Sequence, residues 1–583
     1  MKWFDFVHHT WKKRHVDPEI APDEIFLDVS NTPDFDRTRF EGRIEKPLPH
    51  STFLALALVL GLLFVVLVAR IGDLQLVNGA TYAAQSAYNS LEVTTLFAPR
   101  GIIVDRHGIV LAENVERTEG GMGRNYPLPA FGQIIGYVSY PKKDSSGNYY
   151  DTSQTGIAGL EAEYDALLAG KNGQLLTETD ALGRVRSSGA IVAAQEGATL
   201  NLSLDADLEK YLANAISDIA NSEHFIAGAG VIMNVDTGEV LAMVSYPSYD
   251  PNVMASGDRA DLIAGYNKSP GHPFLDHAVQ GIYTPGSIVK PFIASGALTD
   301  GLITEATTVD DPGFLSLPDP YHPGKTFIYK GWKALGTVDV RRAIAWSSDV
   351  FFYTIGGGFG NQKGLGIDRL DYWYRQFGIG SPTGVDLPGE SSGLVPTPDW
   401  KQKTFQEPWY LGDTYFTSIG QYSTQVTPIQ MARATAAVAN GGKLFTPTLR
   451  MRQAGELSAY TTVAANPASL AIVREGMRQS VTSALARALN VSYVSVAAKT
   501  GTAQTGTRNQ YDNSWVVGFF PYDVPRYAFA VVLERGPSGA GAQSVNVMRR
   551  LLDSLYLAHS PYVGGSGVST STGEQGLPLL TGE

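Results

Sequence analysis

One run of hydrophobic side chains dominates the pattern of the first hundred positions. From Phe53 to Ala69 the sequence is apolar without interruption, and with its flanks this run is long enough to cross a bilayer. The long polar segment before it and the lack of a small-residue cleavage site favour an uncleaved anchor over a signal peptide. A buried helix of a soluble core is the alternative. We predict a transmembrane helix over residues 51–71.

Basic residues around this run predict its orientation, because positive charge favours the cytoplasmic side. Four precede the run, whereas after Arg70 no Lys or Arg follows until Arg100. Residues 1–50 are polar, rich in Pro and Asp, and show no sustained period, which is typical of disorder. We therefore expect a disordered cytoplasmic tail over 1–50, with everything after about Asp73 on the outer side of the membrane. The four basic residues are Arg37, Arg39, Arg43 and Lys46.

Short alternating segments follow the anchor. Residues 98–112 read as two strands joined by a tight turn at His107-Gly108, and a nearby Asp105-Arg106 pair could form an ion pair. A helical pattern over 156–168 and a strand-like piece at 174–179 come next. We predict a small mixed module over 72–205, a pedestal that holds the main domain away from the membrane.

The remaining pattern predicts one large domain over residues 206–560. A helix is expected over 206–221, and residues 230–244 form two apolar strands around an Asp-Thr-Gly-Glu turn. Strands over 513–520 and 527–533 and a helix over 545–557 close the domain. This order fits an α+β fold, an antiparallel sheet with helices before, after and inserted. Residues 561–583 are rich in Gly, Ser and Thr and are expected to be disordered.

Composition narrows the functional classes. The 583 residues are 44% hydrophobic and carry a net charge of -12, which argues against a nucleic-acid-binding surface. The chain has no cysteine, which excludes disulfides, thiolate metal sites and a cysteine nucleophile. Its ten histidines are scattered, and His272 with His277 fits loop and core positions better than a metal site. We expect neither a metal nor a cofactor.

A candidate nucleophile follows a Pro-Gly turn at Pro285-Gly286. Ser287 precedes Lys290 by three positions, so on a helix the amine would lie over the hydroxyl. A lysine can take the proton of a serine only if burial or a second cation lowers its pKa. Alone the pattern is weak, because an N-capping serine followed by a solvated lysine has the same spacing.

Two further motifs lie downstream. Ser347-Ser348-Asp349 precedes an aromatic run, and Lys499-Thr500-Gly501-Thr502 ends a segment with strand-like alternation. Each is unremarkable alone. In this order, however, the three motifs are the joint signature of penicillin-binding proteins and class A β-lactamases.

The sequence resembles the class B penicillin-binding proteins, which cross-link peptidoglycan as D,D-transpeptidases. The resemblance runs from the anchor to about residue 560, and it implies a penicillin-binding/β-lactamase-like transpeptidase domain on an extended pedestal. Asp349, where Asn is commoner, together with 400–403 and 408–414, is similar to the elongation-type branch, penicillin-binding protein 2. The further matching segments are 98–101, 105–108, 159–161, 283–287, 418–421 and 426–430.

The resemblance also implies roles. Ser287 would attack the carbonyl between the last two D-alanines of a donor stem peptide, with Lys290 as base, its pKa lowered by nearby Lys499. Ser347 would bridge the two lysines and pass a proton to the departing amine, and Asp349 would accept hydrogen bonds. The backbone N–H groups of Ser287 and Thr502 would form the oxyanion hole. The remaining motif residues Thr500, Gly501 and Thr502 would, with Lys499, bind the terminal carboxylate, which a β-lactam imitates.

Some positions depart from the family pattern. Tyr422 and Ala498 stand where Gly is common, and both lie beside the expected site. The interval between 105–108 and 136–139 is short, so most of the usual head subdomain is missing. This interval bears on how the chain meets the SEDS-family glycosyltransferase that the resemblance implies as a partner, alongside stem peptides and β-lactams.

Three other functions compete with a transpeptidase. A D,D-carboxypeptidase or a β-lactamase-type hydrolase would share all three motifs but seldom carries the anchor and pedestal. A bifunctional enzyme would need a glycosyltransferase domain, whereas 95–220 reads as strands and turns. A non-catalytic β-lactam sensor or scaffold has no need of a complete set of catalytic residues, and every one is present here.

Overall fold

The computed structural model describes residues 49–89, 91–116, 122–145, 149–179, 185–319, 322 and 324–564. The expected disordered tail before Pro49, and nearly all of the one expected after residue 560, fall outside these ranges. The chain divides into two compact units, one ending at Leu91 and the other starting at Glu92.

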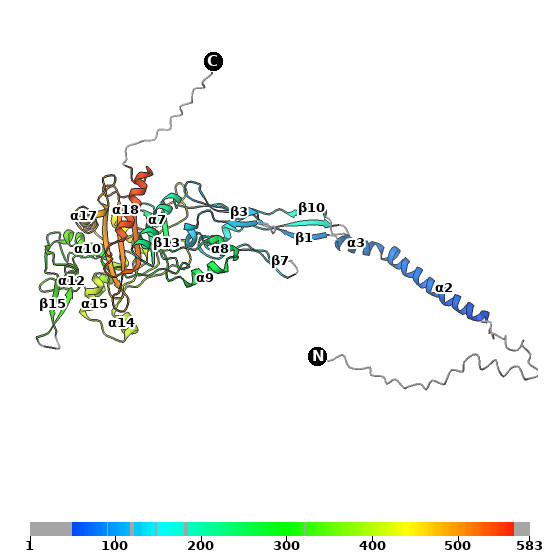
Figure 1. Cartoon of the computed structure of the whole chain (residues 1–583), viewed down its shortest axis with the longest axis horizontal. Helices are drawn as coiled ribbons and strands as arrows, with labels where there is room; N and C mark the ends of the chain where they lie inside the picture. Colours follow the sequence, from blue (N-terminus) through cyan, green and yellow to red (C-terminus); the bar gives the residue numbers. More distant parts are fainter. Residues whose placement is uncertain are drawn as a thin grey trace, which may run out of the picture. The chain divides into compact units, whose positions relative to one another are not determined.

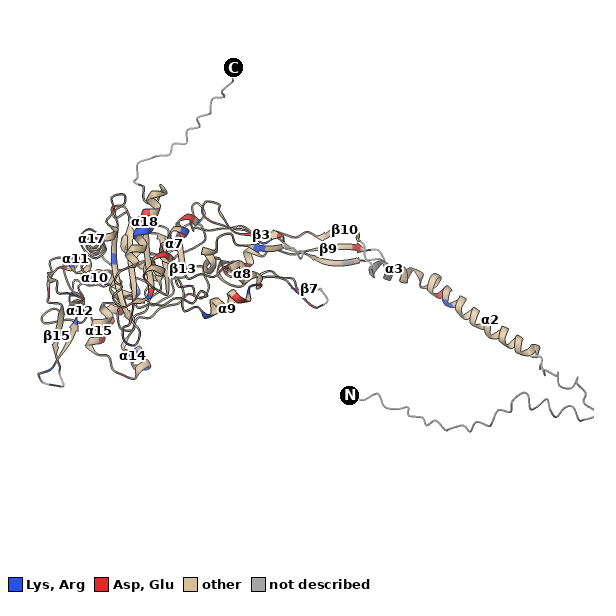
Figure 2. Cartoon of the chain, viewed as in Figure 1, with Lys and Arg blue, Asp and Glu red and all other residues tan. Residues whose placement is uncertain are grey.

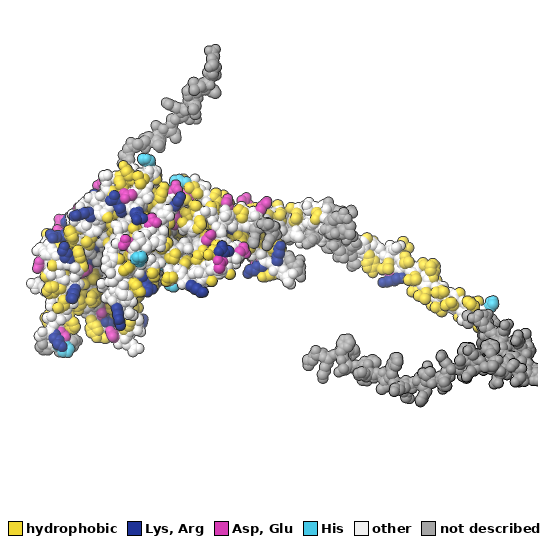
Figure 3. Space-filling model, in the orientation of Figure 1, with side chains coloured by type: hydrophobic (Ala, Val, Ile, Leu, Met, Phe, Trp, Pro, Cys, Tyr) yellow, Lys and Arg dark blue, Asp and Glu magenta, His cyan; other side chains and the backbone are white. Residues whose placement is uncertain are grey.

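The first unit is helical. Helix α2, His50–Gly72, continues as a π-helical turn, Asp73–Val77, and is followed by α3, Gly79–Asn89. Within the described residues, His50–Val77 is the one helical stretch long and apolar enough to cross a membrane. Figures 2 and 3 show α2 without charge and covered by hydrophobic side chains along most of its length. At 1.5 Å per residue, α2 is about as long as a bilayer core is thick. An apolar helix therefore forms where the sequence predicts one.

The pedestal is built from short strands and turns (Figure 1). Two sheets organise it, a four-stranded one in the order β11-β2-β3-β4 and a three-stranded one in the order β1-β9-β10. Its strands are β1 Leu91–Leu96, β2 Ile103–Val104, β3 Val110–Glu116, β4 Met122–Asn125, β5 Val138–Ser139, β6 Lys142–Lys143, β7 Tyr149–Asp151, β8 Thr155–Gly156, β9 Gly173–Thr179, β10 Val185–Val192 and β11 Leu200–Asn201. Its helices are η4 Pro129–Phe131, α4 Gly132–Ile135, α5 Gly159–Glu163 and α6 Asp165–Leu168.

Several local predictions can be compared with this module. The hairpin around His107-Gly108 is confirmed, because β2 and β3 pair antiparallel. The suggested ion pair is replaced by other contacts: the Asp105 carboxylate accepts hydrogen bonds from the backbone N–H groups of His107, Ile109 and Ala206. The helical pattern over 156–168 forms two short helices, α5 and α6, separated at Tyr164.

A buried ionic cluster lies at the centre of the pedestal. Glu161 is fully buried and accepts hydrogen bonds from Arg100 Nε at 2.6 Å and from Arg124 Nε at 2.7 Å. Arg100 also pairs with Asp165 at 2.8 Å. Because buried charges are tolerated only when paired, this cluster fixes the relative positions of three chain segments.

The main domain is organised by a five-stranded antiparallel sheet in the order β13-β12-β22-β21-β20. Alternate residues point to opposite faces, as the period of a strand requires. Val231 and Val517 belong to one hydrophobic cluster, whereas Ile232 and Val516 belong to the other. The strands are β12 Ala227–Asn234, β13 Val240–Tyr246, β20 Ala497–Thr505, β21 Tyr511–Phe520 and β22 Tyr527–Pro537. The predicted α+β sheet and its hairpin are confirmed.

Helices cover both faces of this sheet. Helices α7, Ala206–Ser222, and α18, Ser544–Leu557, pack together on one face, and α16 packs on the other. The elements inserted between β13 and β20 are α8 Pro251–Ser256, α9 Ala260–Lys268, η5 Gly286–Val289, α10 Lys290–Thr299, β14 Val309–Asp311, β15 Phe314–Pro318, β16 Thr326–Lys330, β17 Gly336–Val338, α11 Val340–Ala345, α12 Asp349–Gly357, α13 Gly366–Gln376, α14 Pro398–Phe405, α15 Leu411–Ser418, α16 Pro428–Ala439, β18 Lys443–Phe445, β19 Tyr460–Thr462, α17 Pro467–Ser483 and η6 Arg487–Leu489.

The boundary drawn at residue 561 is too early. Tyr562 and Val563 are buried against the face covered by α7 and α18, and the Tyr562 hydroxyl donates to Asp205 Oδ2 at 2.8 Å. Composition marked the segment as disordered because the Gly- and Ser-rich sequence begins at Gly564, only one residue beyond these two side chains. The packed domain therefore extends to Val563.

Candidate active site

The predicted nucleophile lies on a tighter turn than an α-helix. Ser287 belongs to the 3₁₀ helix η5, and Lys290 is the first residue of α10. In a 3₁₀ helix the side chains at i and i+3 are eclipsed, so this geometry aligns the two groups more closely than the predicted α-helix would. Ser287 is half-buried and Lys290 fully buried.

Contacts from three distant segments hold this turn. The Trp515 indole N–H donates to Thr284 O at 3.0 Å, and Gly286 N–H donates to Gly420 O at 2.9 Å. Gly501 approaches closely, since a Cβ there would lie 2.8 Å from Pro285 O. The turn that carries Ser287 is therefore fixed by the loop around Gly420 and by β20 and β21.

Lys290 reaches the second motif directly. Its Nζ donates to Asp349 Oδ1 at 2.7 Å, to Ser347 O at 2.9 Å and to Ser347 Oγ at 3.2 Å. Ser347 has a positive φ of 59°, an uncommon backbone conformation for a residue other than glycine. The conformation is used to bring its carbonyl and hydroxyl together at the lysine, and such strain is common at functional sites.

A side chain that sequence reasoning missed supports this motif. Ser348 Oγ donates to the buried Asp311 carboxylate at 2.5 Å and accepts from Phe351 N–H at 3.1 Å, which caps α12. Asp349 is therefore held in the first turn of α12, facing Lys290. No sequence signal singles out Asp311, because it lies 38 positions before Asp349 in an unrelated strand.

The third motif lies on β20, which is an edge strand of the sheet. Lys499 is fully buried and its Nζ donates to Thr500 O at 2.7 Å, whereas Thr502 is exposed. Gly501 is the close contact to the nucleophile turn. Gln421, noted in the sequence only as part of a motif, donates from Nε2 to Thr502 O at 3.4 Å. The three motifs thus converge on one site, and the loop around Gln421 borders it.

Burial dominates the electrostatics of the two lysines. Burial lowers the pKa of Lys290, and the Asp349 carboxylate partly restores it. The pKa of Lys499 is held well below its usual value by burial and then by the positive charge of Lys290. The sequence attributed the low pKa of Lys290 to Lys499, whereas desolvation is the main cause. The expected bridge through Ser347 appears here as contacts to Lys290.

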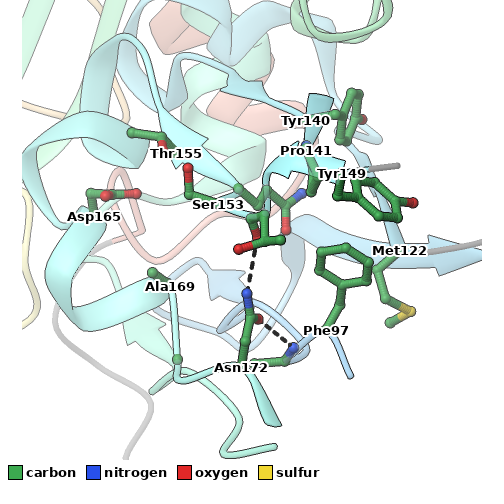
Figure 4. Close-up of a pocket in the computed structure, with 14 residues that line it drawn as sticks. Phe97, Met122, Tyr140, Pro141, Tyr149, Ser153, Thr155, Asp165, Ala169 and Asn172 are labelled. Atoms are coloured by element: carbon green, nitrogen blue, oxygen red, sulfur yellow. Dashed lines mark hydrogen bonds between the residues drawn. The ribbon is translucent and has the colours of Figure 1, made fainter. Parts of the chain in front are cut away.

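A cavity lies in the pedestal, and none of the three motifs lines it. It has a volume of about 210 Å³ and is lined by Phe97, Met122, Tyr149 and other residues (Figure 4). Asn172 fixes its floor, accepting from Ala98 N–H and donating to Thr152 O, both at 2.9 Å. In the part of the chain that the structure describes, no group of His, Asp and Glu side chains is arranged to hold a metal ion.

The fold and the site together define an acyl-transfer enzyme of the penicillin-binding type. Residues 228–553 match the penicillin-binding protein transpeptidase domain, and residues 117–202 match the penicillin-binding protein dimerisation domain. The chain is 31% identical to the peptidoglycan D,D-transpeptidase MrdA of Escherichia coli K12, over 86% of this chain and 94% of that protein. The chain therefore belongs to the penicillin-binding proteins, in the PBP2 (MrdA) branch of peptidoglycan D,D-transpeptidases.

Solved structures agree with this assignment. The crystal structure of Pseudomonas aeruginosa PBP2 in complex with WCK 5153 is similar with a TM-score of 0.66 and 32% identity, over 80% of this chain and 98% of that one. A structure described as "Structural coordination of polymerization and crosslinking by a peptidoglycan synthase complex" has a TM-score of 0.69 and 28% identity, over 89% of this chain and 99% of that one.

Proposed function

We propose that Ser287 is the nucleophile with which this chain cross-links peptidoglycan stem peptides during cell-wall elongation. The observation that carries the proposal is the environment of Lys290, a buried amine of lowered pKa on the same turn as Ser287. A lysine of lowered pKa can accept the serine proton at neutral pH.

In the acylation step, Ser287 Oγ bonds to the carbonyl carbon between the last two D-alanines of the donor. The proton of Oγ passes to Lys290 as the Oγ–C bond forms, which leaves a tetrahedral oxyanion, and the C–N bond breaks when this intermediate collapses. Ser347, whose hydroxyl lies 3.2 Å from Lys290 Nζ, relays a proton to the departing amine of D-alanine. Backbone N–H groups of Ser287 and Thr502 stabilise the oxyanion. The amine of an acceptor stem then attacks the acyl carbon and loses a proton to Lys290, and the Oγ–C bond breaks as Ser287 Oγ regains a proton.

The carboxylate of the donor binds at β20. Thr500 and Thr502 supply hydroxyl donors, and a carboxylate bound beside Lys499 favours the protonated form of its amine, which suits an anion that a β-lactam also presents. Gly501 has no side chain, so the strand can lie against the nucleophile turn. Asp349 keeps Lys290 oriented through their 2.7 Å contact.

Labelling with a fluorescent penicillin tests the nucleophile. The full chain in detergent is expected to form an adduct on Ser287 that persists for many minutes, as located by mass spectrometry. Ser287→Ala should abolish the adduct, and Ser256→Ala, an exposed serine on α8, should retain it. Rapid turnover of the drug would instead indicate a β-lactamase-type or D,D-carboxypeptidase hydrolase. A chain that forms no adduct at all would be a catalytically dead scaffold or would need a partner to complete its site.

The anchor and its orientation form a second part of the proposal. We place α2 in the membrane with the N-terminus cytoplasmic and the transpeptidase domain outside, supported by the excess of basic residues before the helix. The natural chain has no cysteine, so a single one can be introduced without background. In spheroplasts, a membrane-impermeant maleimide should label Ser560→Cys and leave Ser30→Cys unlabelled. The reverse pattern would invert the orientation.

We also propose a partner, a SEDS-family glycosyltransferase that supplies the glycan strands to be cross-linked. The support is the similarity to a peptidoglycan synthase complex that couples polymerisation to crosslinking. Affinity purification of the full chain from its own cells should recover that glycosyltransferase. Recovery without it, from membranes where it is present, would contradict the partnership.

A further inference from the structure

One loop beside the site has an unusual backbone. Gly420 accepts a hydrogen bond from Gly286 N–H at 2.9 Å, and the next residue, Gln421, contacts Thr502 O at 3.4 Å. Tyr422 follows with φ of 65°, in the left-handed region that favours glycine. For a residue with a Cβ this conformation costs roughly 1–2 kcal/mol. A tyrosine is therefore held where the backbone favours glycine, one residue from the edge of the site.

Aromatic rings from two other segments hold Tyr422 in place. Trp400 of α14 and Trp409 of the following connection both meet its ring nearly at right angles, with centroids 6.2 and 5.9 Å away. Such edge-to-face pairs are each worth about 0.5–1.5 kcal/mol, enough to offset the backbone strain. The Trp409 indole N–H is satisfied by Thr414 Oγ1 at 2.8 Å. All three rings remain partly exposed, and we call them the aromatic wall.

A lysine lies within the wall, and two carboxylates, Asp413 at 2.6 Å and the exposed Glu407 at 3.7 Å, lie beside its amine. Lys401 Nζ is 5.9 Å from the Tyr422 ring centroid and 4.5 Å from that of Tyr410. Its charge is paired with Asp413 at 2.6 Å, and its side chain is almost fully buried. The surface offered by the wall is therefore a set of ring faces and edges, suited to an apolar or aromatic group rather than to an anion.

The position of the wall determines which part of a substrate meets it. The terminal carboxylate is taken by Lys499 and Thr500, and the carbonyl that reacts lies at Ser287. The rest of the donor must leave along β20 past Thr502, and Gln421 contacts the carbonyl of that residue. Gln421 is thus the first side chain of this loop that the departing chain meets, and Tyr422 is the residue that follows it.

We propose that the aromatic wall of Trp400, Trp409 and Tyr422 is a specificity subsite for the residue that precedes the two terminal D-alanines of the donor, contacting the apolar part of its side chain. In a β-lactam the corresponding group is the acyl side chain carried by the amino group on the β-lactam ring. This inference rests on the proposed function, because it assumes that the carboxylate end of the donor lies at β20.

A pair of β-lactams isolates the contact. Benzylpenicillin carries an aromatic acyl side chain, and 6-aminopenicillanic acid carries none. The ratio of their second-order acylation rate constants is measured for the full chain in detergent. Tyr422→Gly should lower this ratio about fivefold to tenfold, the rate equivalent of one aromatic contact. The rate with 6-aminopenicillanic acid should stay unchanged. Glycine suits φ of 65°, so this variant folds without strain.

Two control variants distinguish a contact made by the ring from a change to the whole site. Tyr422→Phe keeps the ring and should keep the ratio, and Tyr460→Ala removes an exposed tyrosine on β19 and should also leave it unchanged. Equal loss of both rates in Tyr422→Gly would overturn the proposal, because the ring would then act on the site as a whole. An unchanged ratio would overturn it too. Failure of either drug to acylate Ser287 in the natural chain would refute the proposed function itself.

Discussion

Removing the central carboxylate of the pedestal is a demanding test of the fold. In Glu161→Gln, the shape of the side chain is retained but its charge is lost. Arg100 keeps Asp165 as a partner at 2.8 Å, so most of the loss falls on Arg124, whose Nε donates to Glu161 at 2.7 Å. Both guanidinium side chains are buried, so neither can turn to water.

The magnitude follows from the burial of the group left behind. Removing one partner of a buried ion pair costs about 3–5 kcal/mol. Because Asp165 compensates one arginine, the lower end, about 3 kcal/mol, applies here. At about 2 °C per kcal/mol for a large domain, the melting temperature should fall by about 6 °C.

Differential scanning calorimetry of the full chain in detergent provides the assay. Glu163→Gln changes an exposed carboxylate on the same helix, α5, and is the matched control. The control variant should have the melting temperature of the natural chain. If Glu161→Gln has this melting temperature as well, the cluster contributes no stability and the reasoning from buried charge is wrong.

Three other predictions concern the site and its surroundings. Asp349→Asn removes the charge that raises the pKa of Lys290, so the pH below which the acylation rate falls should be lower in this variant. An unchanged pH profile of the acylation rate would refute Lys290 as the base. Gly501→Ala places a methyl group 2.8 Å from a carbonyl oxygen of the nucleophile turn and should slow acylation about 100-fold. Gly265→Ala has open space around it and should acylate at the rate of the natural chain. Equal acylation rates in the two variants would show that the turn adapts to the added methyl group. Burial raises the pKa of Asp276 to about 6 from 3.8, so the folded state holds a proton that the unfolded state loses. This carboxyl group alone should therefore lower the stability by about 3 kcal/mol as pH rises from about 4 to 6. Across this range the melting temperature of Asp276→Asn should fall less steeply than that of the natural chain, and parallel curves would disprove the prediction.

Much of the fold was predictable because it depends on short-range patterns. The apolar run at 53–69, the hairpin at 230–244 and the strands at 513–520 and 527–533 have the periodicities of the elements that form. The boundary after Leu557 was not predictable in this way. Tyr562 and Val563 are only two side chains, and their burial depends on Asp205 and on a face built by distant helices.

The candidate site likewise combines residues that sequence patterns predict with residues that they do not. Three short motifs identify the residues that the structure brings together, because within each motif particular residue types stand a fixed few positions apart. The residues that support them carry no such pattern. Asp311 accepts a hydrogen bond from Ser348, and Trp515 donates one to Thr284. These two residues are recognisable as part of the site only in the folded chain, where the sheet and the inserted helices bring them to it.

The order of strands in the sheet also determines when during synthesis the enzyme can become competent. All three motifs have emerged once Thr502 is made, but β20 and β21 reach β12 only through β22, which ends at Pro537. A nascent chain that ends at residue 510 contains β20 but not β22, so the sheet cannot yet hold β20 beside Ser287. Contacts between residues hundreds of positions apart form slowly. The sheet contacts that hold β20 beside Ser287 therefore form only after most of the polypeptide has been made.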